Sequence, residues 1–383
     1  MDNLKPIYLD NASTTKVDER VLRSMLPYFT EIYGNASSNH DFGKQAKNAI
    51  EVSRKQIAEL INSNESEIIF TSGATESINF AIKGFVESNF EKGNHIITVK
   101  TEHKAVLATC EYLETKGVEV TYLDVDKDGL ISINDLKEAI RNDTFLICIM
   151  YVNNETGIIQ PIKEIGSIAK VNNITFFCDA TQAVGKIKVD VIENNIDLLS
   201  FSGHKLNASK GVGILYKNKN IELTPLFHGG GQENGLRAGT YNTPLIVGIG
   251  KACEIAINEL EANRDIIETK SKFLIQEINS IKGSIIIGNE NYKVPNIIDV
   301  IIPGFDSNIF ISKTKNFALS NGSACTSQII ESSHVLKAMG FSDAECNQTI
   351  RISIDKEITE SKIKELVETL KAEIKSIYYV EKC

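Results

Sequence analysis

The sequence lacks the segments that would place it in or across a membrane. No uninterrupted apolar run in its 383 residues reaches the ~18 residues needed to span a bilayer. Its first residues, MDNLKPIYLDNAST, have neither the basic region nor the apolar region of a secretory signal peptide. We therefore expect a cytoplasmic protein with no membrane partner.

The sequence also lacks the excess of basic residues that an anionic partner would require. Its 41 lysines and arginines are outnumbered by 50 aspartates and glutamates, which gives a formal net charge of −9. This charge does not favour direct binding of nucleic acid or of an anionic membrane surface. The hydrophobic fraction of 42% and the charged fraction of 24% are ordinary for a soluble globular protein, and the length allows two domains.

The seven cysteines include no CxxC pair. Their scatter argues against a zinc site or a disulfide framework and favours reduced thiols, so no metal is expected. Cys148 and Cys178 lie in strand-like apolar runs and are expected to be buried. Cys346 and Cys383 are interpreted as surface thiols, with a role as sulfur relays as the alternative. Cys325 differs from the others because small residues surround it in SNGSACTS.

Short apolar runs alternate with helical patterns through the first two thirds of the chain. Strands are expected over residues 67–70, 95–99, 118–123, 144–150, 174–179 and 197–202. Between them, apolar residues recur at helical spacing over 73–88, 104–117 and 161–173. Near-continuous apolar strands joined by helices predict an α/β fold with a mostly parallel central sheet and flanking helices on both faces.

A different pattern occupies the last third of the chain. It opens with a helical stretch over 244–281, continues with short separate strands and closes with an amphipathic helix over 360–379. This order predicts a smaller α+β domain. The expected division is a large domain over 15–253 and a small domain formed by 1–14 and 254–383. No Gly/Ser linker separates the two parts, so we expect them to pack tightly.

Small and polar residues follow several of the predicted strands, at the edge of the sheet where α/β proteins form their sites. Gly73, Ala74 and Thr75 stand at the start of a predicted helix, where free N–H groups suit a phosphate. The alternative is an ordinary helix with Thr75 as its N-cap. Asp179 ends an apolar strand, where its carboxylate either holds a cationic ring nitrogen or caps the next helix.

His103 and Asn154 also follow apolar strands. Taken alone, His103 is more often structural, and Asn154 lies in a polar loop of ordinary composition. Lys205, beside Ser202 and His204, is either a solvated turn residue or a positioned amine. A desolvated lysine has a lowered pKa and can form a Schiff base. Together these residues provide what pyridoxal 5′-phosphate (PLP) requires: a phosphate cradle, a carboxylate, a histidine and an amine.

Eight motifs occur in one order along the chain: YLDNASTT, FTSGATES, TEHKAV, VNNETG, DATQAVGK, SFSGHK, HGGGQENGLRAGT and NGSACTS. In this order they resemble those of cysteine desulfurases, in the class V aminotransferase group of fold-type-I PLP enzymes. The resemblance runs from Tyr8 to Ile354. The stretch around Cys325 is similar to the branch with the longer active-site cysteine loop, which serves iron–sulfur cluster assembly and tRNA thiolation.

The resemblance implies a role for each matching residue. Lys205 would hold the cofactor as an imine, and His103 would stack on its ring and move protons. The cofactor contacts would come from Asp179 to the ring nitrogen, Gln182 to the ring hydroxyl, and Ala74, Thr75, Ser202 and His204 to the phosphate. Thr240 would complete the phosphate site of a neighbouring subunit, which implies a homodimer. Asn154 would contact cofactor and substrate.

The remaining implied roles concern the substrate. Arg351 would bind its α-carboxylate, and Cys325 would be the nucleophile that takes its sulfur. The implied reaction converts L-cysteine to L-alanine and passes sulfur, as a persulfide on Cys325, to an acceptor protein for iron–sulfur cluster assembly or tRNA thiolation. Ala36 and Ser209 replace prolines that are common in the family. The alternatives are an aminotransferase or selenocysteine lyase of the same fold, or a non-catalytic scaffold.

Overall fold

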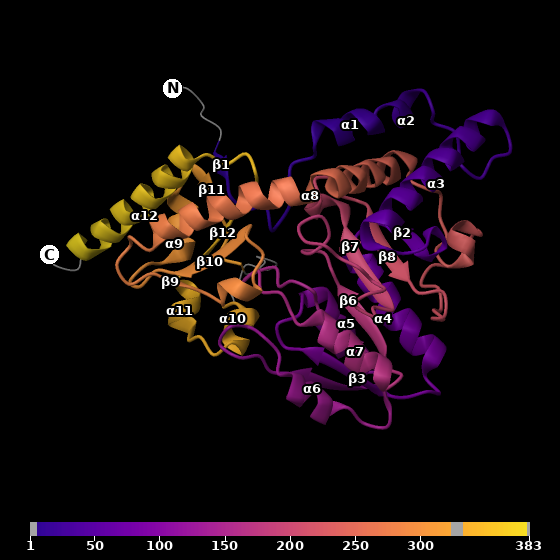
Figure 1. The fold of residues 1–383 in the computed structure, drawn as a ribbon, viewed down its shortest axis with the longest axis horizontal. Coiled ribbons are helices and arrows are strands. Elements are labelled where there is room, and N and C mark those ends of the chain that lie inside the picture. The colour runs from indigo at the N-terminus through magenta and orange to yellow at the C-terminus, as the bar shows by residue number, and fades with distance from the viewer. Residues whose placement is uncertain (1–5, 323–331, 381–383) are drawn as a thin grey trace.

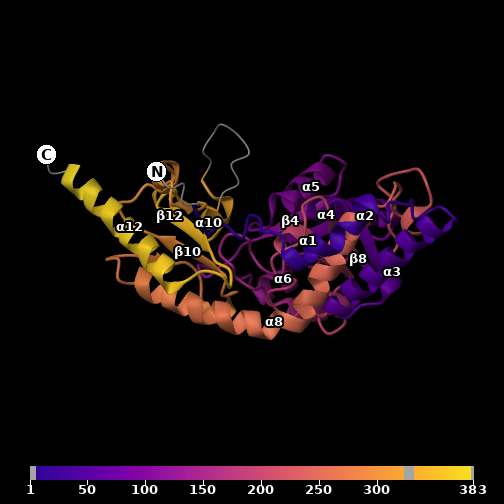
Figure 2. The ribbon, with the colours of Figure 1, turned by 90° about the horizontal axis from the view of Figure 1, so that it is seen from above.

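The computed structural model describes residues 6–322 and 332–380 of the chain. A seven-stranded sheet and a three-stranded sheet lie beside each other, and the long helix α8 (Thr243–Ile278) runs from one to the other (Figures 1 and 2). No helix in these two ranges is both long and apolar enough to cross a membrane.

The larger sheet has the strand order β2-β8-β7-β6-β5-β3-β4. Its strands are β2 (Ile68–Thr71), β3 (His95–Val99), β4 (Glu119–Leu123), β5 (Thr144–Cys148), β6 (Thr175–Asp179), β7 (Leu198–Ser202) and β8 (Gly213–Lys217). β8 is antiparallel to both of its neighbours, and the other pairs are parallel. The predicted mostly parallel sheet is therefore confirmed.

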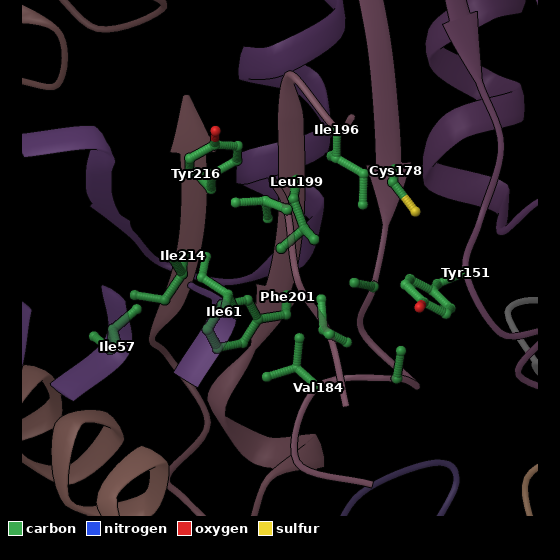
Figure 3. Close-up of a cluster of buried hydrophobic side chains, with 14 of the residues drawn as sticks. Ile57, Ile61, Tyr151, Cys178, Val184, Ile196, Leu199, Phe201, Ile214 and Tyr216 are labelled. Carbon is green, nitrogen blue, oxygen red and sulfur yellow. The ribbon is translucent and has the colours of Figure 1, made fainter. Parts of the chain in front are cut away.

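Helices cover both faces of this sheet, because alternate side chains along each strand point to opposite faces. In β6, Phe176 and Cys178 join one apolar cluster, and Phe177 joins another. The first cluster packs against α3 (Asp41–Ile61), α6 (Ile133–Ala139), α7 (Ile162–Val171) and the first half of α8. Figure 3 shows part of it around Phe201 and Leu199. The second packs against α4 (Ala74–Asn89) and α5 (Lys104–Glu114).

The smaller sheet is antiparallel, with β10 (Ile297–Ile301) between β9 (Ile285–Ile286) and β12 (Thr349–Ser353). One face packs against the second half of α8, α9 (Ser307–Lys313) and α12 (Glu360–Val380). The other face packs against α10 (His334–Ala338) and α11 (Asp343–Asn347).

The prediction of a surface thiol at Cys346 is wrong. Its side chain is only 6% exposed, because α11 turns it toward Leu336 and Met339. Cys148 and Cys178 are fully buried, as predicted. Cys383 lies outside the described residues.

The N-terminal segment joins the two sheets. β1 (Ile7–Tyr8) pairs in parallel with β11 (Phe317–Ala318), and the backbone N–H of Ala12 donates to Ser353 Oγ at 2.9 Å. The chain then crosses to the larger sheet, where Thr15 Oγ1 donates to the carbonyl of His204 at 2.9 Å. The segment therefore contacts elements of both parts of the chain. The domain limits stay a prediction, since the limit at residue 253 falls inside α8.

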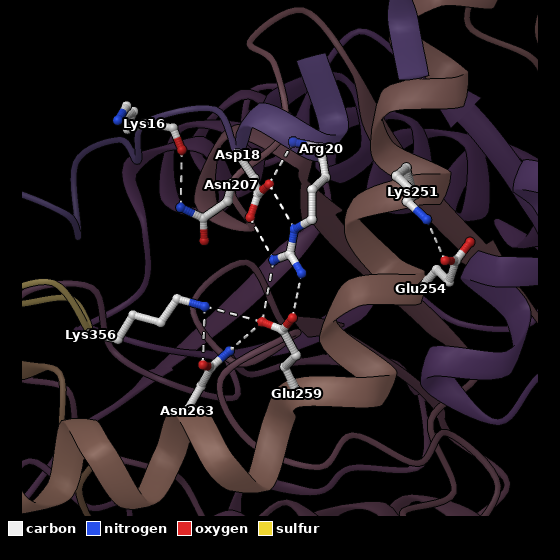
Figure 4. A network of polar contacts seen from close by, with 9 residues as sticks. All are labelled: Lys16, Asp18, Arg20, Asn207, Lys251, Glu254, Glu259, Asn263 and Lys356. Carbon is white, nitrogen blue, oxygen red and sulfur yellow. Dashed lines mark hydrogen bonds and ion pairs between the residues drawn. The ribbon is translucent and has the colours of Figure 1, made fainter. Parts of the chain in front are cut away.

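A polar network ties α1 (Glu19–Met25), which precedes the short α2 (Pro27–Thr30), to α8 and to the chain after β12 (Figure 4). Arg20 pairs with Asp18 at 2.8 Å and also with Glu259. Lys356 Nζ lies 3.1 Å from a carboxylate oxygen of the same Glu259 and donates to Asn263 Oδ1 at 3.2 Å. Ion pairs therefore connect α1, α8 and the chain after β12 at the junction of the two sheets.

Candidate active site

A pocket of about 560 Å³ lies where several strands of the larger sheet end. β6 ends at Asp179 and β7 at Ser202, and α4 begins just after β2. All predicted site residues except Thr240 and Cys325 line it: Ala74, Thr75, His103, Asn154, Asp179, Gln182, Ser202, His204, Lys205 and Arg351. The pocket thus forms at the carboxyl edge of the sheet, where the sequence places it.

The N-terminus of α4 forms one wall of the pocket. Gly73 is its N-cap, and among the described residues no side chain accepts a hydrogen bond from the first turn. The alternative in which Thr75 caps the helix is therefore wrong. A Cβ on Gly213 would come within 2.5 Å of the Gly73 backbone, so β8 needs glycine to lie against this turn. The backbone N–H groups at Ala74 and Thr75, together with Ser202 and His204, can receive a phosphate.

Lys205 ends a short 3₁₀ turn, Gly203–Lys205, that follows β7. Its Nζ donates to the backbone carbonyls of Ala12 and, at 2.7 Å, of Ser13. Burial and the nearby charge of Arg351 together lower the pKa of this amine to about 8, against the opposite effect of Asp10 and Asp179. Lys205 is therefore a positioned amine and not a solvated turn residue.

His204 and His103 have lowered pKa values as well. Burial, followed by the charges of Lys205 and Lys210, lowers the pKa of His204 to about 4, so its imidazole is neutral at pH 7. His103 is the N-cap of α5, and its Nδ1 accepts from the N–H of Ala105 at 3.1 Å. The pKa of His103 is lowered because the pocket walls displace water from the ring.

Asp179 and Gln182 lie on the chain that leaves β6. Asp179 is 5% exposed, and one of its oxygens accepts the N–H of Thr181 at 2.9 Å, which fixes the carboxylate in a turn. No α-helix begins there, so the alternative in which Asp179 caps the next helix is wrong. Gln182 is 3% exposed, and its Nε2 donates to the carbonyl of Ala12 at 2.8 Å.

Arg351 reaches the pocket from β12 of the smaller sheet. One guanidinium nitrogen donates to Asp10 Oδ1 at 2.8 Å and to Ser13 Oγ at 2.6 Å. The other terminal nitrogen donates to the carbonyl of Asn154 at 2.8 Å. The Nε atom is buried with no hydrogen-bond partner in the described structure. Arg351 therefore carries an unused donor in the wall of the pocket, which a carboxylate can accept.

The structure does not bring Thr240 or Cys325 into the pocket. Thr240 is exposed on the loop before α8 and does not line this pocket. Cys325 lies outside the described residues. Ser320 and Gly322, which precede it in the chain, do line the pocket.

Sequence reasoning missed two buried acids beside the pocket. Glu102 is fully buried, and its Oε2 accepts a hydrogen bond from the backbone N–H of His103 at 3.0 Å. Burial raises the pKa of Glu102 well above its usual range. Glu155 accepts the hydroxyl of Ser333 at 2.5 Å, and a Cβ on Gly322 would lie 3.0 Å from the same oxygen. Both acids follow an apolar run inside motifs already noted, TEHKAV and VNNETG, and that position was the available signal.

Comparison with known proteins agrees with this geometry. A model of the family described as Aminotransferase class-V matches residues 7–366. The chain belongs to the class-V aminotransferase family. Within that family it is 47% identical to "Cysteine desulfurase, mitosomal" of Trachipleistophora hominis, over 97% of this chain and 86% of the relative. It is 46% identical to "Cysteine desulfurase IscS" of Methanosarcina thermophila, over 96% of this chain and 91% of the relative.

Solved structures also resemble this member of the class-V aminotransferase family. A "NifS-like protein" superposes with a TM-score of 0.90 at 37% identity and covers 98% of this chain and 100% of its own. "SspA in complex with cysteine" superposes with a TM-score of 0.83 at 41% identity and covers 92% of this chain and 99% of its own. The predicted fold and the predicted family are confirmed.

PLP is the cofactor of this family, and the pocket fits it. The helix terminus of α4 has no side-chain cap, and the hydroxyl of Thr181 and Nε of Arg351 are buried without hydrogen-bond partners in the described structure. A phosphate, a ring substituent and a carboxylate would satisfy such groups. Lys205, whose amine has a pKa of about 8, lines the same pocket.

Proposed function

We propose that this member of the class-V aminotransferase family is a cysteine desulfurase that converts L-cysteine to L-alanine and passes the sulfur to an acceptor protein. One observation carries the proposal: a partly buried amine, a buried carboxylate and a guanidinium with an unused donor converge on one pocket, at Lys205, Asp179 and Arg351. Relatives named cysteine desulfurase at 46–47% identity support this choice within the family.

The cofactor and the pocket residues have separate roles in the proposed reaction. When bound, PLP supplies an aldehyde carbon and an electron-accepting ring. Lys205 would hold it through Nζ, and the same amine, when free, would take the proton from the substrate Cα. Asp179 keeps the ring nitrogen protonated, which favours electron withdrawal from Cα. The uncapped turn at Ala74 and Thr75, with Ser202, holds the phosphate.

The substrate is held by its polar groups. Arg351 binds the α-carboxylate through its guanidinium, whose orientation is fixed by Asp10 and by the carbonyl of Asn154. His103 would lie against the cofactor ring and would exchange protons through Nε2, since Nδ1 accepts from the backbone of α5. Gln182 offers its amide N–H to the ring hydroxyl.

Cys325 takes the sulfur in this proposal. Its thiolate attacks the substrate sulfur, a sulfur–sulfur bond forms, and the bond between Cβ and sulfur breaks. The electron pair of that bond stays with the three-carbon fragment, which leaves as alanine after protonation. The products are alanine and a persulfide on Cys325, so no external oxidant is required. The motif NGSACTS supports this role.

A second copy of the chain is the proposed partner in a homodimer. Leu26, Phe29 and Tyr33 leave large apolar surfaces exposed around α2, at 54%, 55% and 69%, and Phe42 at the start of α3 is 49% exposed. Apolar surface of this extent favours burial against another subunit. Thr240, exposed and outside its own pocket, would reach the phosphate site of the partner.

The acceptor and the compartment complete the proposal. An iron–sulfur scaffold or a tRNA-thiolation protein receives the sulfur, and the reaction takes place in the cytoplasm. The stretch around Cys325, which is similar to the branch that serves iron–sulfur cluster assembly and tRNA thiolation, supports these acceptors.

The variant Cys325→Ser tests the proposal. The protein is supplied with L-cysteine and a thiol reductant, and alanine and sulfide are measured. Cys325→Ser is expected to release neither product while it keeps the visible absorption of bound PLP; Cys383→Ser, the matched control, is expected to keep both. Unaffected turnover in Cys325→Ser would point instead to an aminotransferase or a selenocysteine lyase. Absence of PLP absorption in the wild type would point to a scaffold.

A further inference from the structure

A second lysine approaches the PLP-binding lysine from the same loop that carries Gln182. Lys186 is half-buried, and its Nζ donates to Gln182 Oε1. It lines a second cavity of about 430 Å³, and Lys205 lines both this cavity and the active-site pocket. The side chain of Lys186 therefore lies next to the reaction centre, although it faces a different cavity.

Lys186 and Lys205 belong to one chain of hydrogen bonds. Lys186 donates to Oε1 of Gln182, and Nε2 of the same amide donates to the carbonyl of Ala12 at 2.8 Å. That carbonyl also accepts from Lys205 Nζ. An amide has an acceptor end and a donor end, and an amine that donates to the acceptor end fixes which way it points. With Lys186 in place, the NH₂ group of Gln182 faces Ala12 and the pocket.

The charges around the two lysines show whether Lys186 raises or lowers the proton affinity of Lys205. Lys186 is close to two other cations, Lys205 and Arg351, and burial together with these charges lowers its pKa to about 7. The groups that act on Lys205 are Arg351, which disfavours a proton on its nitrogen, and Asp10 and Asp179, which favour one. Repulsion between two cations is mutual, so Lys186, where it is protonated, disfavours a proton on Lys205 in the same sense as Arg351 does.

We propose that Lys186 is a positioning residue: it orients the amide of Gln182 toward the cofactor and disfavours a proton on the Lys205 nitrogen. This inference rests on the proposed function, in which Lys205 holds PLP. Loss of Lys186 removes the positive charge that its amine carries below a pKa of about 7. It also leaves the acceptor end of a side chain that is only 3% exposed without its partner, so the amide loses its fixed orientation. Both changes favour protonation of the Lys205 nitrogen.

The test is a pH titration of the visible absorption of bound PLP, which reports protonation of the nitrogen that holds it. Lys186→Met keeps the length of the side chain and removes its donor and charge. We expect the titration midpoint to rise by about one pH unit, a tenfold change in proton affinity, and PLP to dissociate more readily. The matched control is Lys188→Met: Lys188 is two residues further on and 77% exposed, and its titration is expected to be unchanged.

Two further variants separate the possible outcomes. Lys186→Arg keeps the charge and a donor and is expected to restore the wild-type midpoint. Lys186→Gln keeps an N–H donor without the charge, is expected to show part of the rise, and serves as the test if Lys186→Met does not fold. A midpoint in Lys186→Met or Lys186→Gln equal to wild type, with PLP bound, would overturn the inference and leave the proposed function intact. A wild-type protein with no PLP band would overturn the proposed function itself.

Discussion

Replacing Glu233 by glutamine is expected to destabilise the protein by about 3 kcal/mol. Glu233 is 2% exposed at its side chain and forms a two-pronged pair with Arg54, at 2.9 and 3.0 Å. One of its oxygens also accepts the N–H of Phe70 at 3.0 Å. The pair joins the loop before α8 to α3 and β2, and Glu233 itself adopts a left-handed backbone with φ of 49°.

The magnitude follows from the charge left behind. Burial by itself would lower the pKa of Arg54, but the hydrogen bonds and charge of Glu233 raise it, so the guanidinium stays charged. Removing one partner of a buried pair costs ~3–5 kcal/mol. Glutamine keeps one acceptor oxygen, and Glu51 remains 3.1 Å from Arg54 Nε on a half-exposed side chain, which offsets about 0.5–1 kcal/mol. The expected loss is therefore near the lower end of the range.

Urea unfolding followed by circular dichroism measures the loss. With a dependence on urea of about 3 kcal/mol per molar for a chain of this size, the midpoint is expected to fall by roughly 1 M. The matched control is Glu193→Gln, which breaks an exposed pair with Lys163 and is expected to cost less than about 1 kcal/mol. The double variant Arg54→Met with Glu233→Met is expected to be more stable than Glu233→Gln, because no charge remains buried. A loss below about 1 kcal/mol in Glu233→Gln, or a double variant less stable than it, would refute the reasoning.

Two further predictions concern the Lys205 loop. With a pKa near 8, the amine of Lys205 becomes neutral, and thus nucleophilic, at lower pH than an ordinary lysine. The rate at which apo-protein captures PLP, followed by stopped-flow absorbance, should rise about tenfold per pH unit to pH 8 and level off above it; a rise that continues beyond pH 9.5 would contradict this. Ser209→Pro is expected to tighten PLP binding and to stabilise the fold by about 0.4–1 kcal/mol, because proline restricts the unfolded loop. Equal PLP dissociation constants for the two proteins would count against it.

The sequence was most informative where apolar runs are continuous. β3, β5, β6 and β7 lie within the predicted runs because every residue in them is buried, and a buried parallel strand needs no polar alternation. The helix α3 was not predicted. Its buried side includes Ile50, Ile57 and Ile61 at helical spacing, so the periodic apolar signal was present in the sequence, and the helix packs closely on α8.

The site residues at the ends of strands were predictable from the sequence, but their contacts with residues far away in the chain were not. Asp179 and Lys205 could be placed beside each other because the carboxyl ends of neighbouring strands meet at one edge of a sheet. Nothing local reveals that the carbonyls of Ala12 and Ser13 accept from Lys205, or that Arg351 pairs with Asp10, 341 positions away. These contacts depend on how the two sheets are assembled.

The crossing of the N-terminal segment between the sheets sets an order of events during synthesis. Ala12 emerges from the ribosome long before Ser353, the residue that receives its N–H 341 positions later. At ~5–20 residues per second, roughly 20–70 seconds separate the two. Lys205 and Asp179 are already translated in that interval, but Arg351 and the strand that carries it are not. A nascent chain therefore has the attachment point for its cofactor before it has a substrate site, and activity begins only when β12, the last strand in the described residues, has been made.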